Sequence, residues 1–258
     1  MAAVLQQALD EAGNPRFLLK GGTLLQHRLP GQARATADLD GPVRGDLEDF
    51  LAAADPVLRR PWGPLTFRRG PAEAIDTPTR VVKPRRFDVI VQLGGVTWRR
   101  IQVEASPDEG AAGASWERLP SPSLAGFGLP TPDHLVGLAM RYQAAEKVHA
   151  STDPHDPAAH INDRARAAVD LVLIRGLSEE TGEPPLAGVR EAIRDVFAAR
   201  AAEAATLGRP VRRWPARLVA HPHWDGSFGK AARSAGLAMT LPEAVAHVNS
   251  WLDQIDAA

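Results

Sequence analysis

The sequence predicts an α+β protein in which a small mixed sheet with helices precedes a mostly helical C-terminal half. An apolar–polar alternation at 34–40 is typical of a strand. Two further β-rich runs flank Gly94-Gly95, a dipeptide that favours a two-residue hairpin turn. Beyond residue 132 the apolar side chains recur with a helical period, so we expect the sheet and most of the helices in different halves of the chain.

Local signals place each element of the N-terminal half. Asn14-Pro15 ends the first expected helix and Pro30-Gly31 ends the second, because proline cannot continue a helix. Strands are recognised by alternation, because side chains two residues apart lie on the same face of a sheet. The expected helices cover 2–12, 24–29 and 46–58, and the expected strands cover 34–40, 87–93 and 96–105.

A stretch rich in Pro, Gly and Ser at 107–132 is typical of a domain boundary. We therefore expect a catalytic domain at 1–130 and a helical domain at 131–258. In the second domain the expected helices cover 133–151, 163–175, 186–205 and 241–255.

The composition fits an ordinary globular protein and excludes several classes of site. Of the 258 residues, 44% are hydrophobic, 24% are charged and none is cysteine. Disulfides, cysteine-ligated zinc and a thiol nucleophile are therefore excluded. No apolar window is long enough to span a bilayer, and residues 1–14 lack the layout of a signal peptide. We expect a cytoplasmic protein with no membrane partner.

Asp38 and Asp40 form the motif that most suggests catalysis. On a strand both carboxylates project from one face, and adjacent carboxylates repel each other unless a cation lies between them. Hard oxygen ligands of this kind suit Mg²⁺. A further carboxylate is expected from a neighbouring strand, where Glu104 is favoured over Asp88 as the third metal ligand. An isolated Asp-x-Asp is more often a solvent-facing strand end, so its neighbours decide the interpretation.

A glycine-rich loop precedes this strand. Its glycines let the backbone approach a phosphate, and the N-terminus of the following helix offers free N–H groups. A loop of this kind followed by an Asp-x-Asp strand is much more specific than either motif alone. Arg34 could contact a nucleotide phosphate or brace the carboxylates. The expected nucleotide-binding residues are Lys20, Gly21, Gly22, Thr23, Arg34 and Thr36.

Two basic stretches interrupt a nearly neutral chain. Ten Lys or Arg residues against three acids lie between Val57 and Arg100, and a second stretch covers 209–233. Local basic faces can bind a polyanion, although most charge runs are simply solvated surface. Trp214 and Trp224 could stack on bases there, whereas packing in a helical core is the more common role.

Together these motifs resemble the nucleotidyltransferase toxins of the AbiEii type, within the DNA polymerase β-like nucleotidyltransferase superfamily. The resemblance rests on 17–25, 34–40 and 144–150, the last followed by 164–171. It implies a polymerase-β-like catalytic domain that transfers a nucleoside monophosphate from a nucleoside triphosphate to an RNA acceptor, with the 3′ end of transfer RNA favoured. It also implies an antitoxin partner, often one with a winged-helix domain.

The resemblance also assigns two residues of the helical domain. Lys147 matches a lysine that contacts the triphosphate. The family often shows a basic residue followed by Asp, and a second Asp three residues later. Here Ala167 follows Arg166, so the first of these acids is missing and Asp170 remains. Asp170 either takes over the catalytic role or caps the helix or pairs with Arg166.

Other functions stay open at this stage. The same chemistry could modify a protein or a small molecule such as an aminoglycoside. The missing acid at Ala167 also makes a catalytically inactive binding module conceivable, although intact Asp38, Asp40 and Lys147 argue against it. A zinc site is disfavoured, because no histidine pair has the helical spacing of a zinc protease.

Overall fold

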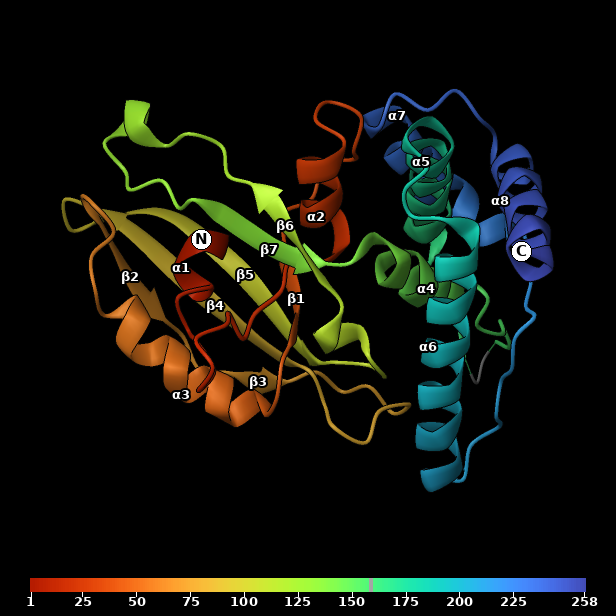
Figure 1. Ribbon diagram of the computed structural model, residues 1–258, viewed down its shortest axis with the longest axis horizontal. Coiled ribbons are helices and arrows are strands. Elements are labelled where there is room, and N and C mark those ends of the chain that lie inside the picture. The colour runs from red at the N-terminus through yellow and green to blue at the C-terminus, as the bar shows by residue number, and fades with distance from the viewer. Residues whose placement is uncertain (158–159) are drawn as a thin grey trace. The chain divides into compact units, whose positions relative to one another are not determined.

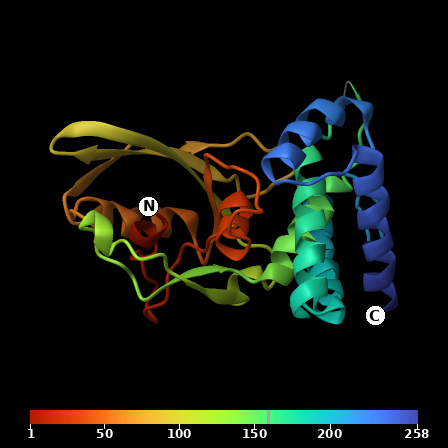
Figure 2. The same cartoon turned by 90° about the horizontal axis from the view of Figure 1, so that it is seen from above.

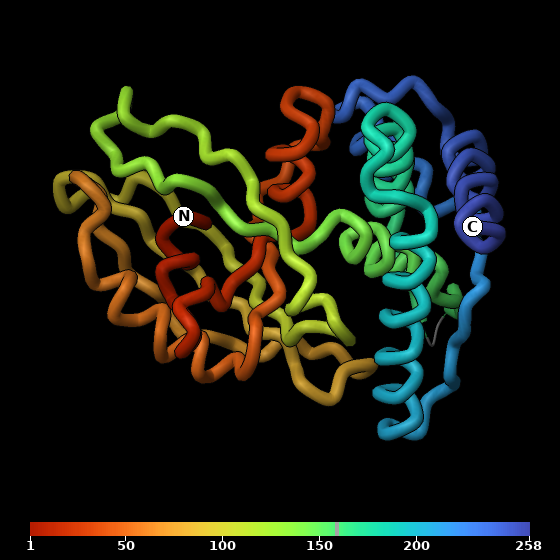
Figure 3. Tube along the Cα trace, viewed as in Figure 1, coloured from red at the N-terminus to blue at the C-terminus, as the bar shows by residue number. Residues whose placement is uncertain are grey.

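A computed structural model of the chain describes residues 1–157 and 160–258 and divides into two compact units (Figure 1). The first unit comprises Met1–Arg28 and Thr36–Leu138, and the second comprises Leu29–Ala35 and Ala139–Ala258. The division therefore falls after Leu138 rather than at residue 130, and a short segment before Thr36 belongs to the second unit. The N-terminus lies in the first unit and the C-terminus in the second (Figure 3).

The first unit is built around a mixed five-stranded sheet. Strand β1 pairs in parallel with β5, whereas β4 pairs antiparallel with β5, β2 and β3. A separate antiparallel pair joins β6 and β7. The strands are β1 (Leu39–Val43), β2 (Leu65–Arg69), β3 (Glu73–Ala74), β4 (Arg85–Leu93), β5 (Val96–Pro107), β6 (Trp116–Pro120) and β7 (His134–Leu138).

The hairpin predicted around Gly94-Gly95 is confirmed as β4 and β5. The two glycines have φ of 58° and 79°, the left-handed conformation that a two-residue primed turn requires. Along β4 the side chains of Phe87, Val89 and Val91 are buried, while those between them are partly exposed. One face of the sheet is thus apolar and the other carries polar side chains.

Helix α3 covers the apolar face of the sheet (Figure 2). It buries Phe50, which stacks on Phe17 with ring centroids 5.7 Å apart. The helices of this unit are α1 (Ala2–Leu5), α2 (Gly21–Arg28) and α3 (Leu47–Leu58), with 3₁₀ turns η1 (Ala112–Ala114) and η2 (Ala125–Phe127).

The second unit is helical, as predicted. Helix α4 packs on α5 and α6, and α5 packs on α7 and α8. Trp224 is fully buried and donates from Nε1 to the Asn162 carbonyl at 2.6 Å, so it is a core residue. No described helix is both long and apolar enough to cross a membrane. The helices are α4 (Met140–Ser151), α5 (Ala165–Thr181), α6 (Leu186–Thr206), α7 (Asp225–Ser234) and α8 (Leu241–Ala257), with the 3₁₀ turn η3 (Pro222–Trp224).

Several sequence predictions were wrong in extent, among them the helix expected at 163–175, which runs to Thr181. The first helix ends at Leu5, where the helical pattern gives way to tighter turns in which the N–H of Gln7 and of Ala8 donate to the carbonyls of Val4 and Leu5, each at 3.1 Å. The strand expected at 34–40 begins only at Leu39, where its pairing with β5 starts opposite Val103. The helix expected at 133–151 begins at Met140, and the short apolar run before it is strand β7. Such short apolar runs fit a strand as well as a helix.

Asp46 is the N-cap of α3, as its carboxylate accepts from the backbone N–H of Glu48 at 2.8 Å and of Asp49 at 3.1 Å. We expect Asp46→Ala to lower the free energy of unfolding by about 1 kcal/mol, because two helix N–H groups lose their acceptor. Urea unfolding followed by circular dichroism measures this. Asp46→Asn keeps a capping oxygen and should stay close to the wild type; equal losses in both variants would contradict the capping role.

Candidate active site

The sequence-predicted carboxylates lie on β1 and β5, at one edge of the sheet. In the parallel register Asp40 is directly opposite Glu104, so the two side chains share a face. Asp38 lies two residues earlier, immediately before β1 begins. Gln102 connects the two strands, because its Nε2 donates to Asp38 Oδ1 and to Glu104 Oε1, both at 3.4 Å.

Glu104, rather than the competing Asp88, is the neighbour of Asp40. Asp88 lies one strand further from β1, on β4, where it forms an ion pair with Arg100 at 3.1 Å. Glu104 receives two hydrogen bonds from Arg86, whose Nε and Nη2 lie 2.9 and 2.6 Å from Oε1. The Arg86 guanidinium therefore offsets part of the repulsion between the carboxylates.

The glycine-rich loop lies against the same carboxylates. Gly21 begins α2 with a φ of +66°, and a Cβ there would lie 2.6 Å from Asp40 Oδ2. A Cβ on Gly22 would lie 2.9 Å from the Thr36 Cβ. A side chain at Gly21 would therefore clash with Asp40, and a side chain at Gly22 would clash with Thr36. Because Asp40 reaches the first residue of α2, the carboxylates adjoin a helix N-terminus, which attracts anions such as phosphate.

Lys20 and Thr23 connect this loop to the sheet. The Lys20 backbone N–H donates to the Asp40 carbonyl at 2.9 Å, and its Nζ donates to Ser106 Oγ at 2.9 Å. The Thr23 hydroxyl donates to the Asp38 carbonyl at 3.2 Å. The predicted nucleotide-binding residues of the first unit therefore lie beside Asp38 and Asp40.

Among the described residues, no group of three or more acidic, histidine or cysteine side chains is arranged to hold a metal ion. Asp38 and Glu104 instead share the amide of Gln102. Their oxygen donors nevertheless suit Mg²⁺, which proteins bind through one or two carboxylates while water and substrate phosphates complete its shell. The residues therefore fit a metal site shared with a nucleotide rather than a closed protein cage.

The histidines of the second unit form a ring cluster instead of a metal site. His155, His221 and His223 contact one another with centroids 4.3 to 5.6 Å apart. Burial lowers the pKa of His221, and the neighbouring His155 and His223 lower it further. His223 Nε2 lies 2.8 Å from the Asn162 carbonyl. This packing of the rings against one another gives no support to the zinc alternative.

The two family-derived residues of the second unit contact each other. Asp170 is fully buried, and its Oδ2 lies 2.5 Å from Lys147 Nζ. Arg34 donates to both oxygens of Asp170, at 3.0 and 3.2 Å. This arrangement differs from the pairing with Arg166 considered above. Arg34 was considered either as a phosphate contact or as a brace for Asp38 and Asp40. In the structure it holds a carboxylate, but that carboxylate belongs to Asp170. Two cations surround one anion, so the group carries a net positive charge.

Several residues at these sites were not singled out from the sequence. Gln102 and Ser106 share the polar face of β5 with Glu104, so the period-two alternation was the signal that could have found them. The role of Arg86 depends on its register with Glu104, which the sequence does not show.

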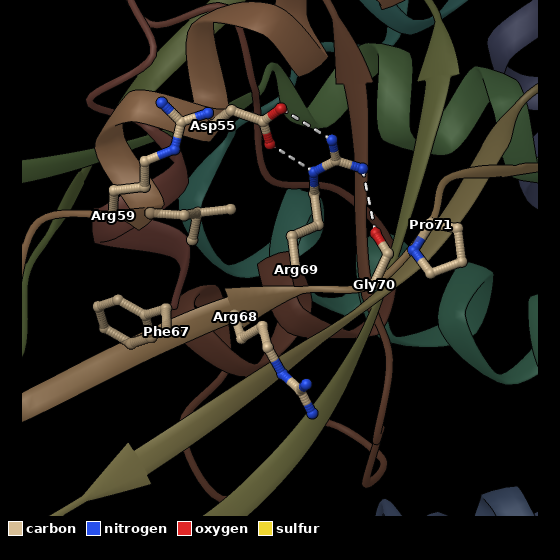
Figure 4. Close-up of a pocket in the computed structure, with 8 residues that line it drawn as sticks. Asp55, Arg59, Phe67, Arg68, Arg69, Gly70 and Pro71 are labelled. Atoms are coloured by element: carbon tan, nitrogen blue, oxygen red, sulfur yellow. Dashed lines mark hydrogen bonds and ion pairs between the residues drawn. The ribbon is translucent and has the colours of Figure 1, made fainter. Parts of the chain in front are cut away.

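The arginines of the first basic stretch are largely used within the protein. Figure 4 shows one of the two pockets described, of about 370 Å³, in which Nε and Nη2 of Arg69 donate to the carboxylate of Asp55 at 2.7 and 2.9 Å. The hydrogen bond from Arg69 lowers the pKa of Asp55. The second pocket, of about 480 Å³, includes Arg212 and Trp214. Neither pocket is lined by the carboxylates above, so neither is the candidate active site.

The comparisons with known proteins assign the family. Residues 3–247 match the family described as nucleotidyl transferase AbiEii toxin, type IV TA system. The chain belongs to the AbiEii family. It is therefore a nucleotidyltransferase toxin of a toxin–antitoxin system, and the family implies a nucleoside triphosphate substrate and an antitoxin partner.

Solved structures similar to this AbiEii-family chain include two from Helicobacter pylori. A candidate nucleotidyltransferase has 14% identity and a TM-score of 0.48, covering 99% of this chain and 91% of its own. JHP933 has 13% identity and a TM-score of 0.45, covering 99% and 88%. The nucleotidyltransferase toxin MenT4 from Mycobacterium tuberculosis has 20% identity and a TM-score of 0.48, covering 93% and 85%. No curated protein matches the sequence. The assignment rests on the family match.

Gly21→Ala tests the contact between Asp40 and the start of α2. We expect the catalytic activity to fall far more than the stability, because a Cβ would displace the carboxylate. Transfer rates and thermal unfolding measure the two effects. Gly13→Ala is a matched control in the same unit, with a φ of +80° but nothing within 4 Å of a Cβ. Equal loss of activity in both variants would show that backbone strain alone is responsible.

Asp170→Ala tests the buried charge cluster. We expect the free energy of unfolding to fall by about 3–5 kcal/mol, because two largely buried cations lose their shared anion. Asp253→Ala removes an exposed ion pair with Arg217 in the same unit and should cost less than about 1 kcal/mol. Urea unfolding compares them, and similar midpoints for the two variants would contradict the assigned role of Asp170.

Proposed function

We propose that the protein transfers a nucleoside monophosphate from a nucleoside triphosphate to RNA, with the 3′ end of transfer RNA as the favoured acceptor. The observation that supports this proposal is the position of Asp40. Its carboxylate is paired in register with Glu104 and lies against Gly21 at the start of α2. Two carboxylates of the kind that bind Mg²⁺ thus adjoin a helix N-terminus of the kind that binds phosphate. Nucleotidyl transfer needs this combination.

The nucleotide is proposed to bind with its terminal phosphates at Gly22 and Thr23, where the N-terminus of α2 favours negative charge. Asp38, Asp40 and Glu104 would hold Mg²⁺ against the phosphates. When bound, this ion supplies neutralisation of the phosphate charge. Gln102 keeps Asp38 and Glu104 at a fixed separation before the nucleotide arrives.

In the proposed reaction an acceptor hydroxyl attacks the α-phosphorus of the nucleotide. A new oxygen–phosphorus bond forms in line with the bond to pyrophosphate, which breaks, and the hydroxyl proton is released to water. The protein contributes mainly by positioning and by electrostatic stabilisation, because phosphoryl transfer needs little covalent help. Asp38 and Asp40 are the residues proposed to fix the geometry.

Lys147 is proposed to neutralise the negative charge that develops on the departing pyrophosphate. Arg34, four residues before Asp38 in the chain, is proposed to assist it. Asp170 is fully buried and contacts both cations, so it acts as a positioning residue that fixes Lys147 and Arg34. The net positive charge of the three side chains supports a phosphate-facing role. We also propose that the reaction takes place in the cytoplasm.

A transfer assay tests the proposal. Each α-labelled nucleoside triphosphate is incubated with Mg²⁺, total cellular RNA and either the wild type or Asp38→Ala. We expect label in RNA with the wild type, and a loss of at least about 100-fold in the variant, because the site loses a charged group that acts on the transition state. A chelator should abolish the reaction and added Mg²⁺ restore it.

Asp88→Ala is the matched control, since it removes an acid from the adjacent strand whose partner is Arg100. It should retain nearly full activity. Full activity of Asp38→Ala would refute the assignment of the site. Label in protein or in a small molecule, with none in RNA, would replace the proposed acceptor, and no label under any condition would indicate an inactive binding module.

A further inference from the structure

The β4–β5 hairpin contains a bulge at Trp98. Thr97 pairs with Gln92 and Arg99 pairs with Val91, so the shift in register between Val91 and Gln92 leaves Trp98 without a partner residue. A bulge of this kind interrupts the ladder and redirects the side chains around it, and bulges are frequent beside functional sites. A regular hairpin would form without this extra residue, so the bulge at Trp98 calls for another explanation.

Trp98 is also exposed, at 66% of its possible surface. By contrast, Trp224 and Trp251 are 0% and 1% exposed. A large aromatic side chain contributes most to stability when it is buried. An exposed tryptophan on a bulge therefore indicates a role in binding rather than in the core. Val96 is 72% exposed beside it, at the same end of the hairpin.

Two arginines near Trp98 lie on the face of the sheet that carries the carboxylates. Arg68 on β2 is in register with Ile90 on β4, and Ile90 is in register with Arg100 on β5. These three residues form a row across the sheet. Arg100 alternates with Gln102 and Glu104 along β5, so the row shares the face of the carboxylates.

The charge of this row is available to a ligand. Within the described part of the chain Arg68 forms no ion pair, and Arg100 has Asp88 as a partner while its side chain stays 68% exposed. Other arginines of the first basic stretch are neutralised by acids of the chain, at Arg69, Arg80, Arg85 and Arg86. No acid lies between residues 93 and 100.

We propose that Trp98, together with Arg68 and Arg100, forms the surface that binds the RNA acceptor. Trp98 stacks on a base and the arginines contact phosphates, which is the combination that proteins use to hold single-stranded RNA. The inference rests on the proposed function, in which RNA is the acceptor. The exposed apolar residues alone would suit a protein partner equally well. The nearby arginines, with no acid between residues 93 and 100, favour RNA.

The spacing along β5 says which part of the RNA is bound. Trp98 lies six residues before Glu104, a separation of roughly 20 Å at the rise of an extended strand. A stacked nucleic-acid strand covers that distance with roughly six nucleotides. The surface thus contacts nucleotides several positions from the reacting end, and an acceptor of two or three nucleotides is too short to reach it.

Steady-state transfer kinetics with long and short acceptors test the inference. For long RNA we expect Trp98→Ala to raise KM by roughly 5- to 150-fold, the effect of losing one base–aromatic stack, with kcat little changed. Trp98→Phe should restore most of the affinity. A trinucleotide acceptor should be used equally well by all three proteins. Replacing Arg68 and Arg100 with Gln should reduce the salt dependence of RNA binding by roughly two units of slope.

The controls are Phe127→Ala and Arg118→Gln, which remove an exposed aromatic and an exposed arginine elsewhere in the same unit. Both should leave KM for RNA unchanged. An unchanged KM in Trp98→Ala with long RNA would overturn the inference, as would an equal loss with the trinucleotide. Weakened antitoxin binding with RNA kinetics intact would overturn it too, by showing a protein interface.

Failure of the proposed function gives a different result. If the wild type labels no RNA under any condition, the acceptor assignment fails, and direct binding of total RNA by mobility shift then decides the surface. Weaker binding by Trp98→Ala than by Phe127→Ala would support the RNA-binding surface even then. Equal binding by both variants and the wild type would overturn it.

Discussion

The parallel pairing of β1 with β5 is the constraint on which the candidate active site depends. It places Asp40 opposite Glu104 and carries Asp38 to the side of Gln102. Separately, the backbone N–H of Lys20 donates to the Asp40 carbonyl, so that α2 begins at the carboxylates. A shift of β1 by one residue along β5 would turn the Asp40 side chain to the face opposite Glu104.

Bringing carboxylates together costs free energy, and the structure offsets that cost with specific neighbours. Arg86 provides a full charge at Glu104, and Gln102 provides amide hydrogens between two acids. In the second unit the signs are reversed, since the buried Asp170 holds two cations. Each group retains an excess of one charge, negative in the first and positive in the second.

The sequence predicted what local chemistry determines. Gly94-Gly95 specified its turn because only glycine readily adopts the left-handed conformation twice in succession. Asp46 specified the start of α3 because its side chain replaces a missing helix acceptor. The loop at Gly21 was also found from its glycines, which allow a close approach of the backbone. These features need no information from distant parts of the chain.

What the sequence did not predict depends on distant partners. Asp170 binds Arg34, 136 positions away, and no local pattern distinguishes that partner from Arg166. β7 was taken for the start of a helix because its partner, β6, lies in a stretch whose Pro, Gly and Ser content is typical of a linker. The role of Gln102 arises only once two strands are aligned.

The assignment of Leu29–Ala35 to the second unit has a consequence for how this protein can evolve. The chain passes between the units after Arg28, after Ala35 and again after Leu138. A single recombination point therefore cannot exchange one unit for another, because Arg34 would be separated from Asp170 or a foreign segment would interrupt the first unit. An exchange of the second unit keeps this buried ion pair only if residues 29–35 are exchanged together with residues 139–258.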